Sequence, residues 1–347
     1  MRSPRFTRVS EGYPFLRLLV TSKAGERLEV VMDTEALETF VAVHREQGFS
    51  RAARVLHRTQ PAISRRISLL EHELGAPLFE RVTGGIVLSQ AGRVLLPYAE
   101  RALAAVKDAT EAVRGLRADA GGPVSLASVG TLAGTNLTVV LQQFTKSHPR
   151  VDLTFRTARS AEVSDLVRRG EVSIGLRYER DRSPDLQCES LGAESLVVVC
   201  GPGHRLAGRE VAALQALRDE RWLAFPDVSG QREIAASHVF GLFLTRGLGE
   251  VDWTAVDSLT AQKRLVEAGF GLALMTESSI TEELAAGALS TIGVKQLGAG
   301  AQVYLVTRKN GFLSQAALRL LELLRTEYAA GGGQQKPRGR RKSVARR

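Results

Sequence analysis

Residues 59–75 read TQPAISRRISLLEHELG, and this stretch decides how the N-terminal part of the chain is interpreted. Apolar residues recur along it at intervals of three or four positions: Ile63, Ile67, Leu70 and Leu74. This periodicity predicts a helix with one buried face. Thr59 can cap the helix, Pro61 suits its first turn, and Gly75 can end it. The opposite face of the helix is not expected to pack in the core, and it carries Gln60, Ser64, Arg65 and Ser68.

Two shorter helices are predicted immediately before this one. Residues 34–47, TEALETFVAVHREQ, carry apolar residues at helical spacing, with Thr34 as the expected cap. Residues 50–57, SRAARVLH, predict a short helix capped by Ser50, and a tight turn then leads into the third helix. This order predicts a helix-turn-helix, whose recognition helix enters the DNA major groove. There, Gln can bond adenine, Arg can bond guanine, and Ser can bond a base or a phosphate.

A hairpin is predicted directly after the third helix. Residues 78–92, LFERVTGGIVLSQAG, indicate a strand, a tight Gly-Gly turn, a second strand and a new helix capped by Ser89. A hairpin in this place makes a winged helix-turn-helix, with Arg81 and the turn from Thr83 to Gly85 reaching the minor groove or the DNA backbone. Five arginines and no acidic residue lie between Gln47 and Leu70. Taken alone, these features also fit the solvated, charged face of a helical bundle.

The motifs S-x-A-A-x-x-L-H, Q-P-A-I-S and L-E-x-x-L-G-x-x-L-F-E-R, followed by the wing, resemble those of the LysR-type transcriptional regulators. The resemblance continues to about residue 328, although its motifs are looser there. It implies a DNA-binding domain over residues 32–90 of a ligand-responsive regulator. The residues placed at DNA are Ser50, Arg51, Gln60, Pro61, Ser64, Arg65, Ser68, Arg81 and Thr83.

Residues 91–117 predict a long linker helix with a heptad seam. The seam consists of Leu95, Ala99, Ala102, Val106, Ala109, Val113 and Leu116. Pro97 is expected to kink the helix, and residues 118–123, ADAGGP, indicate a hinge. The pattern fits a dimerising helix and also an amphipathic helix that packs on its own domain. A homodimer, or the homotetramer that the resemblance implies, would bind an inverted repeat in double-stranded promoter DNA.

Strand-like and helix-like patterns alternate over residues 124–328, which predicts an α/β fold with a parallel sheet. The strands expected there include SLVVVCGP, residues 195–202, and VDSL, residues 256–259. The resemblance implies two half-domains around a cleft for a small-molecule effector, as in periplasmic solute-binding proteins. Ligands in such folds lie at the carboxyl ends of strands and near helix N-termini. This rule selects Ser128, Val129, Thr131, Ser160, Arg177, Tyr178, Phe225, Asp257 and Ser258.

Each of these nine residues could instead serve an ordinary turn or cap. Val129 stands where the family frequently has a polar residue, which suggests an effector that is less polar at this point.

The net charge of +10 belongs to the two ends of the chain. Residues 1–31 carry a charge of +3, residues 331–347 carry +7, and the body between them is neutral. We expect residues 1–31 to be an unstructured extension ahead of Met32, with a genuine N-terminal arm as the alternative. The basic segment 329–347 is expected to be disordered, and it is either simply solvated or a nonspecific contact to DNA phosphates.

Motifs for catalysis or metal binding are missing from the sequence. It contains no P-loop, G-x-S-x-G, H-E-x-x-H or C-x-x-C, and its six histidines are not paired at metal-ligand spacing. We therefore expect a regulator without enzyme activity, cofactor or metal. The rival functions are an enzyme built on the α/β unit and a nucleic-acid binder without sequence preference.

The same sequence features predict where the protein acts. No apolar run of about 18 residues occurs, so no membrane span is expected. Two cysteines make no disulfide framework, which indicates a reducing, cytoplasmic location. Cys188 and Cys200 are expected to be buried thiols, with a redox switch as the alternative. RNA polymerase is a further candidate partner.

Overall fold

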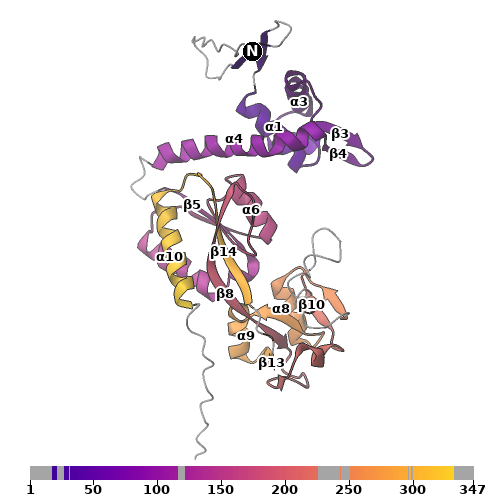
Figure 1. Ribbon diagram of the computed structural model, residues 1–347, viewed down its shortest axis with the longest axis vertical. Coiled ribbons are helices and arrows are strands. Elements are labelled where there is room, and N and C mark those ends of the chain that lie inside the picture. The colour runs from indigo at the N-terminus through magenta and orange to yellow at the C-terminus, as the bar shows by residue number, and fades with distance from the viewer. Residues whose placement is uncertain are drawn as a thin grey trace, which may run out of the picture. The chain divides into compact units, whose positions relative to one another are not determined.

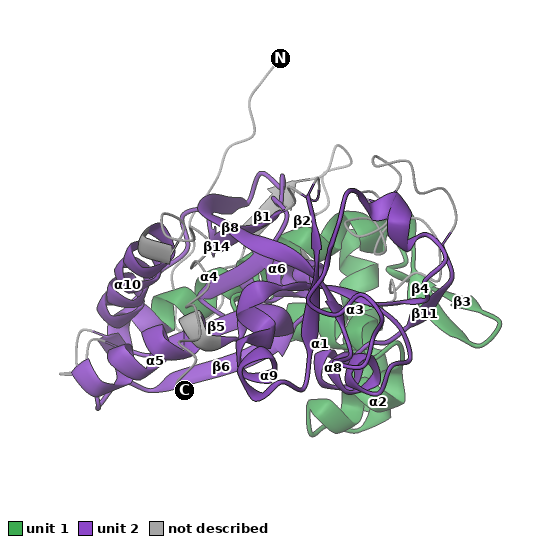
Figure 2. Ribbon diagram, turned by 90° about the horizontal axis from the view of Figure 1, so that it is seen from below, with its two compact units in different colours: residues 1–110, 168–170 green, residues 111–167, 171–347 purple. Residues whose placement is uncertain are grey.

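The computed structural model describes residues 18–21, 27–30, 32–115, 122–225, 243, 251–295, 297 and 300–331. These residues belong to two compact units, which Figure 2 shows in different colours. The first unit comprises residues 1–110 with 168–170, and the second comprises residues 111–167 with 171–347. Each unit has a buried core of its own.

Three helices build the core of the first unit: α1 (Thr34–Arg45), α2 (Phe49–Val55) and α3 (Gln60–Leu74). Phe40 of α1 is fully buried and belongs to the same core as Ile63, Ile67 and Leu70 of α3. The apolar stripe predicted for α3 is therefore confirmed at three of its four positions. Leu74 is 38% exposed because it is the last residue of the helix, which Gly75 ends with a φ of 67°.

The helix caps differ from the sequence expectations. Asp33 rather than Thr34 caps α1, because its carboxylate accepts a 2.6 Å hydrogen bond from the Ala36 amide. Gly48 precedes α2, so Ser50 lies inside the first turn and is not the cap. Thr59 does occupy the cap position of α3, but its side chain makes no capping hydrogen bond. Where several small polar residues are adjacent, the sequence alone does not select the one that caps.

A two-stranded hairpin follows α3 and consists of β3 (Phe79–Val82) and β4 (Gly85–Leu88). Val82 pairs with Gly85 across a two-residue turn in which Gly84 has a φ of 98°, so the predicted wing is present. Ser89 caps the next helix, α4 (Gln90–Gly115), by accepting a 3.0 Å hydrogen bond from the Gly92 amide. The helix continues through Pro97 as one element (Figure 1). Residues 116–121, with most of the predicted hinge, lie outside the described residues.

Both ends of the chain are more ordered than expected. The strands β1 (Leu18–Thr21) and β2 (Arg27–Val30) pair antiparallel, so the expectation that residues 1–31 are unstructured is wrong for these strands. Their leucine and valine content favours strand pairing. The final helix, α10 (Gln315–Gly331), extends into the segment 329–347 that was expected to be disordered. Residues 332–347 lie outside the described part of the chain.

The second unit begins with a half-domain built on three parallel strands. These are β5 (Val124–Val129), β6 (Leu153–Ala158) and β7 (Ile174–Tyr178), with β5 between the other two. The helices of this half-domain are η1 (Gly130–Leu132), α5 (Thr135–Ser147), α6 (Ser160–Arg168) and α10. Helices α5 and α10 share one buried core with the sheet, whereas α6 contributes to another. Figure 1 shows α10 and α6 on opposite faces of the sheet.

Two long strands, β8 (Leu186–Cys200) and β14 (Gly300–Arg308), connect the two half-domains. They pair with each other and β14 also pairs with β7, all antiparallel, in the strand order β6-β5-β7-β14-β8-β13-β9. The predicted α/β class is therefore correct, and the predicted parallel pairing holds for β5, β6 and β7 but not for β14 and β8. The strand expected at residues 195–202 begins nine positions earlier, at Leu186. Its first half contains too many polar residues to be recognised as a strand from the sequence.

The second half-domain completes this unit. Its elements are β9 (Glu210–Val211), η2 (Leu214–Leu217), β10 (Trp222–Ala224), β11 (Trp253–Ala255), α8 (Leu259–Glu267), β12 (Ala273–Thr276), η3 (Glu277–Ile280), α9 (Thr281–Ala286) and β13 (Ser290–Val294). The strand predicted at residues 256–259 lies at 253–255 instead, and it pairs parallel with β10. Ser258 caps α8, which explains why the following segment is helical. Among the described helices, none is both long and apolar enough to cross a bilayer.

Candidate functional site

The outward face of α3 carries the polar residues that the sequence singled out. Ser64 is half-buried, and the exposed residues are Gln60, Pro61, Arg65 and Ser68. Arg65 makes no hydrogen bond or ion pair within the described part of the chain. An unpaired guanidinium beside amide and hydroxyl groups can bond base edges or phosphates without first breaking an internal contact.

Two neighbouring arginines are already paired. Glu35 of α1 accepts hydrogen bonds from Arg58, at 3.3 Å, and from Arg66. Asp33 adds a weaker ion pair to Arg66 at 3.9 Å. The local excess of arginine is therefore partly neutralised by the first helix, and Arg65 is distinguished from Arg66 by its lack of an acidic partner.

Arg51 has a structural role that the sequence did not reveal. Its guanidinium donates hydrogen bonds to two backbone carbonyls at the end of α1, those of Glu46 and Gln47, the latter at 2.6 Å. These carbonyls have no partner within the helix, and a cation there also interacts favourably with the helix dipole. Arg51 therefore fixes the junction between α1 and α2. Ser50, the preceding candidate, is exposed at the start of α2.

The wing presents its candidates to solvent. Arg81 on β3 and Thr83 in the turn are exposed, and neither makes an internal hydrogen bond or ion pair within the described residues. Val82 and Val87 are exposed beside them, at 47% and 43%. Both predicted wing residues are thus available for contacts outside the chain.

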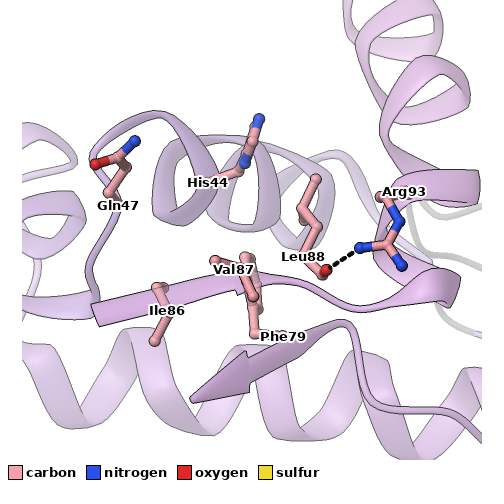
Figure 3. Close-up of a pocket in the computed structure, with 7 residues that line it drawn as sticks. All are labelled: His44, Gln47, Phe79, Ile86, Val87, Leu88 and Arg93. Carbon is pink, nitrogen blue, oxygen red and sulfur yellow. Dashed lines mark hydrogen bonds between the residues drawn. The ribbon is translucent and has the colours of Figure 1, made fainter. Parts of the chain in front are cut away.

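A pocket of about 240 Å³ lies between the end of α1, the wing and the start of α4 (Figure 3). Its lining residues are His44, Gln47, Phe79, Ile86, Val87, Leu88 and Arg93. Arg93 donates a 2.7 Å hydrogen bond to the Leu88 carbonyl, and burial together with Arg45 lowers the pKa of His44. Small-molecule sites typically occupy about 300–1,000 Å³. The pocket is therefore small for an effector, and its packing supports the base of the wing.

In the second unit, the structure separates the predicted effector residues. Arg177 is buried, and it donates hydrogen bonds to Ser164 and, at 3.0 Å, to Asp181. Its guanidinium is thus used on the α6 face of the sheet. Ser128 is fully buried and its hydroxyl donates to the Val129 carbonyl at 3.2 Å, while Val129 packs in the core. All three side chains contact other parts of the chain in this structure, and their role at an effector stays a prediction.

The remaining candidates lie at element ends. Ser160 is the first residue of α6, and Phe225 follows β10. Ser258 accepts a 3.4 Å hydrogen bond from the Ala261 amide as the cap of α8, and Asp257 beside it is exposed. Within the described residues, none of these four forms a hydrogen bond or ion pair with Tyr178, another of the predicted effector residues.

Tyr178 anchors a half-buried polar cluster at the junction of the two half-domains. Its hydroxyl donates a 2.9 Å hydrogen bond to Glu194 of β8, and the Ser278 hydroxyl donates to the other oxygen of the same carboxylate at 3.0 Å. Tyr178 ends β7 of the first half-domain, whereas Ser278 follows β12 of the second. One carboxylate therefore links the two half-domains.

Burial shifts the ionisation of this cluster. It raises the pKa of Tyr178, and the nearby Glu194 carboxylate raises it further. Burial likewise raises the pKa of Glu194, against the hydrogen bonds from Tyr178 and Ser278, which lower it. Thr131 lies close enough to affect the Tyr178 phenol, but its buried hydroxyl has no hydrogen-bond partner of regular geometry.

Sequence reasoning missed Glu194 and Ser278 of this cluster, and also Tyr328, whose phenol lies near enough to Glu194 for the carboxylate to raise its pKa. Ser278 follows the carboxyl end of β12, so the rule that selected Thr131 and Tyr178 could have found it. Glu194 lies in the middle of a strand, where no local signal distinguishes it from a solvent-facing residue. Tyr328 is near the end of α10, where its spacing indicates only the buried face of a helix.

The two cysteines cannot form a disulfide with each other in this fold. Both lie on β8, near its two ends, and twelve residues of extended strand separate them by roughly 40 Å. Disulfides need α-carbons within about 7 Å. Burial raises the pKa of the Cys188 thiol and that of Cys200, the latter to about 11. Among the described residues, no group of three His, Cys, Asp or Glu side chains is placed to hold a metal ion.

A winged helix-turn-helix joined to a two-part α/β unit defines a DNA-binding regulator with a ligand-binding domain. Residues 34–93 match the model of the bacterial regulatory helix-turn-helix protein, lysR family, and residues 117–329 match the LysR substrate binding domain. The chain belongs to the LysR family of transcriptional regulators.

Individual relatives agree with this assignment. The chain is 31% identical over 264 residues to the HTH-type transcriptional regulator CfxR of Cupriavidus necator, covering 74% of this chain and 80% of CfxR. It is 28% identical over 295 residues to the RuBisCO operon transcriptional regulator of Allochromatium vinosum, covering 84% and 95% of the two chains.

Solved structures of full-length regulators are also similar to the chain. Full-length BenM has a TM-score of 0.53 and 26% identity, covering 88% of this chain and 100% of BenM. Full-length CbnR complexed with its target DNA has a TM-score of 0.57 and 25% identity, covering 85% and 100%. The chain is accordingly a ligand-responsive, DNA-binding transcriptional regulator and not an enzyme.

Proposed function

We propose that the protein binds an inverted repeat in promoter DNA through α3 and the wing. The observation that carries this proposal is the unpaired Arg65, which lies among exposed polar groups on α3 while Arg58 and Arg66 are neutralised by Glu35. Gln60 and Ser64 flank it for base or phosphate contacts, and Arg81 with Thr83 extends the surface along the wing.

Binding as a dimer follows from α4. Its seam has exposed apolar residues at positions that a second helix would cover, and Val106 and Val113 are 49% and 58% exposed. We propose that these seams pair between two copies, as a homodimer or as half of a homotetramer, which matches two recognition helices to an inverted repeat. We propose that the protein acts on DNA in the cytoplasm, with RNA polymerase as a candidate partner.

The small-molecule effector is proposed to bind beside the cluster of Thr131, Tyr178, Glu194 and Ser278. Support comes from its position at the carboxyl ends of β5, β7 and β12, where α/β folds place ligands. A ligand that contacts both half-domains can change their relative placement, and so shift the spacing of the DNA-binding units.

The test is genome-wide DNA occupancy of the tagged protein, started at Met32, together with a version that lacks residues 331–347. We expect a few sharp peaks that share an inverted repeat in both cases. The truncated version should lose only affinity that depends steeply on salt. Diffuse occupancy that disappears with the tail would leave a nucleic-acid binder without sequence preference as the function.

A further inference from the structure

The carboxylate of Glu194 faces hydroxyl groups and no cation. Its two oxygens accept hydrogen bonds from Tyr178 and Ser278, and no Lys, Arg or His in the described part of the chain forms an ion pair with it. The other acidic side chain of the same strand differs in this respect, because Glu189 is paired with Arg325 at 2.7 Å. Glu194 is thus a half-buried acid of β8 for which the described part of the chain supplies no counter-charge.

Partial burial of a carboxylate without a cation is unfavourable, since hydroxyl donors replace only part of the hydration that it loses. An ionised carboxylate offers about four lone-pair positions. Tyr178 and Ser278 fill two of them, and the Thr276 hydroxyl also lies near enough to lower the pKa of Glu194. The arrangement is therefore an incomplete site for a positive charge.

Two further hydroxyl groups in the same region are buried without a partner: Thr131 Oγ1 and the phenol of Tyr328. Tyr328 is only 8% exposed, and Glu194 lies near enough to raise the pKa of its phenol. Buried hydroxyl groups are almost always hydrogen-bonded in folded proteins. Unpaired hydroxyls beside an unpaired carboxylate indicate that a polar group from outside the chain belongs among them.

We propose that the effector carries a positively charged nitrogen, an ammonium or a guanidinium group, which binds Glu194 between the two half-domains. This inference rests on the proposed function, in which the C-terminal unit senses a small molecule. Unpartnered hydroxyls of Thr131 and Tyr328 would accept from the same cation or from a polar group next to it. An effector whose recognised group is a carboxylate is disfavoured, because it would face Glu194 with a like charge.

The expected selectivity can be tested with three molecules of similar shape: benzylamine, benzyl alcohol and benzoate. Both tryptophans of the chain, Trp222 and Trp253, lie in the second unit, so the thermal transition followed by tryptophan fluorescence reports on this unit. We expect millimolar benzylamine to raise the temperature of the thermal transition of the full-length protein. Benzyl alcohol and benzoate should bind at least tenfold more weakly than benzylamine. Glu194→Gln should weaken benzylamine binding at least tenfold, and Glu189→Gln should leave it unchanged.

A second measurement needs no added ligand. Glutamine keeps the shape of Glu194 and removes the uncompensated charge. Its NH2 group replaces one acceptor oxygen by a donor, and the Ser278 hydroxyl can turn to accept from it. Glu194→Gln should therefore melt at a higher temperature than the wild-type protein. A lower melting temperature would show that the carboxylate serves the fold and not a ligand, and would overturn the proposal. Benzoate binding as tightly as benzylamine, unchanged benzylamine binding by the variant, or no binding of benzylamine to the wild-type protein would overturn it too.

Failure of this inference is separable from failure of the proposed function. Ligand-free Glu194→Gln should still select the wild-type inverted repeat, because the substitution lies in the second unit. If the wild-type protein itself selects no inverted repeat, the proposed DNA function is wrong whatever the amine result.

Discussion

The packing of α4 against the base of the wing makes Gly92→Ala a sharp test of the first unit. A methyl group at Gly92 would lie 2.2 Å from the Leu78 carbonyl oxygen and 3.0 Å from Leu88 Cδ2. Ordinary contacts of this kind are about 3.5 Å, so the wing would have to move by roughly 1 Å. The Leu78 carbonyl also accepts a 2.9 Å hydrogen bond from the Ser89 amide, which the movement would strain.

The steric, hydrogen-bond and helix-propensity effects of Gly92→Ala can be combined into an expected change in the free energy of unfolding. Overpacking of this kind costs about 1–3 kcal/mol, and the strained Ser89 bond is worth about 1 kcal/mol. Replacing a helical glycine by alanine stabilises the helix by about 1 kcal/mol, because alanine has the higher helix propensity. The net loss for Gly92→Ala is therefore about 2 kcal/mol, confined to the first unit.

Urea unfolding can resolve this loss, since tryptophan fluorescence follows only the second unit and far-ultraviolet circular dichroism follows the helices of both. The circular-dichroism transition of Gly92→Ala should shift by about 1 M urea while the fluorescence transition stays in place. Gly85→Ala is the control, because no heavy atom lies within 4 Å of its added methyl group. Unchanged circular dichroism in Gly92→Ala would refute the close contact between α4 and Leu78.

Three other predictions concern function and electrostatics. Arg65→Ala should weaken binding to the specific DNA site by about 1–3 kcal/mol if Arg65 reads a base. Arg58→Ala is the control and should weaken binding less, because Arg58 is paired with Glu35. Titrations against the specific site and random DNA test this, and equal losses of affinity for the two DNAs would make Arg65 a phosphate contact. Replacing Val106 and Val113 by lysine should shift the oligomer toward monomer in sedimentation experiments, and an unchanged oligomer would contradict pairing through α4. Because burial raises the folded-state pKa of Glu194 above about 4.5, its protonated form favours folding, and the wild-type protein should lose stability as the pH rises through that value. The melting advantage of Glu194→Gln should therefore be absent below about pH 4.5 and grow above it, and a pH-independent difference would contradict this assignment.

The sequence predicted the first unit well because its signals are local. Helical spacing located the three helices, and Ser89 marked the start of α4 correctly. The wing was predicted from a Gly-Gly turn, whereas the turn consists of Thr83 and Gly84, with Gly85 already in β4. The misplaced caps at Asp33 and Gly48 are errors of one or two residues. The second unit was predicted less well, because β8 and β14 derive their antiparallel pairing from partners far along the chain, which no local pattern encodes.

Strand alternation explains why only part of the effector site was predicted. Gly175 and Arg177 face α6, whereas Leu176 and Tyr178 face the core shared with α5 and α10. Arg177 and Tyr178 are adjacent at the end of β7, so their side chains point to opposite faces of the sheet and could not share one site. The alternation alone could have predicted this. No such rule identifies Glu194, because its importance depends on Tyr178 and Ser278, which approach it from opposite half-domains. A charge without a partner is recognised only when all of its neighbours are known, and for this reason our proposal for the chemistry of the effector rests on the folded chain and not on the motifs.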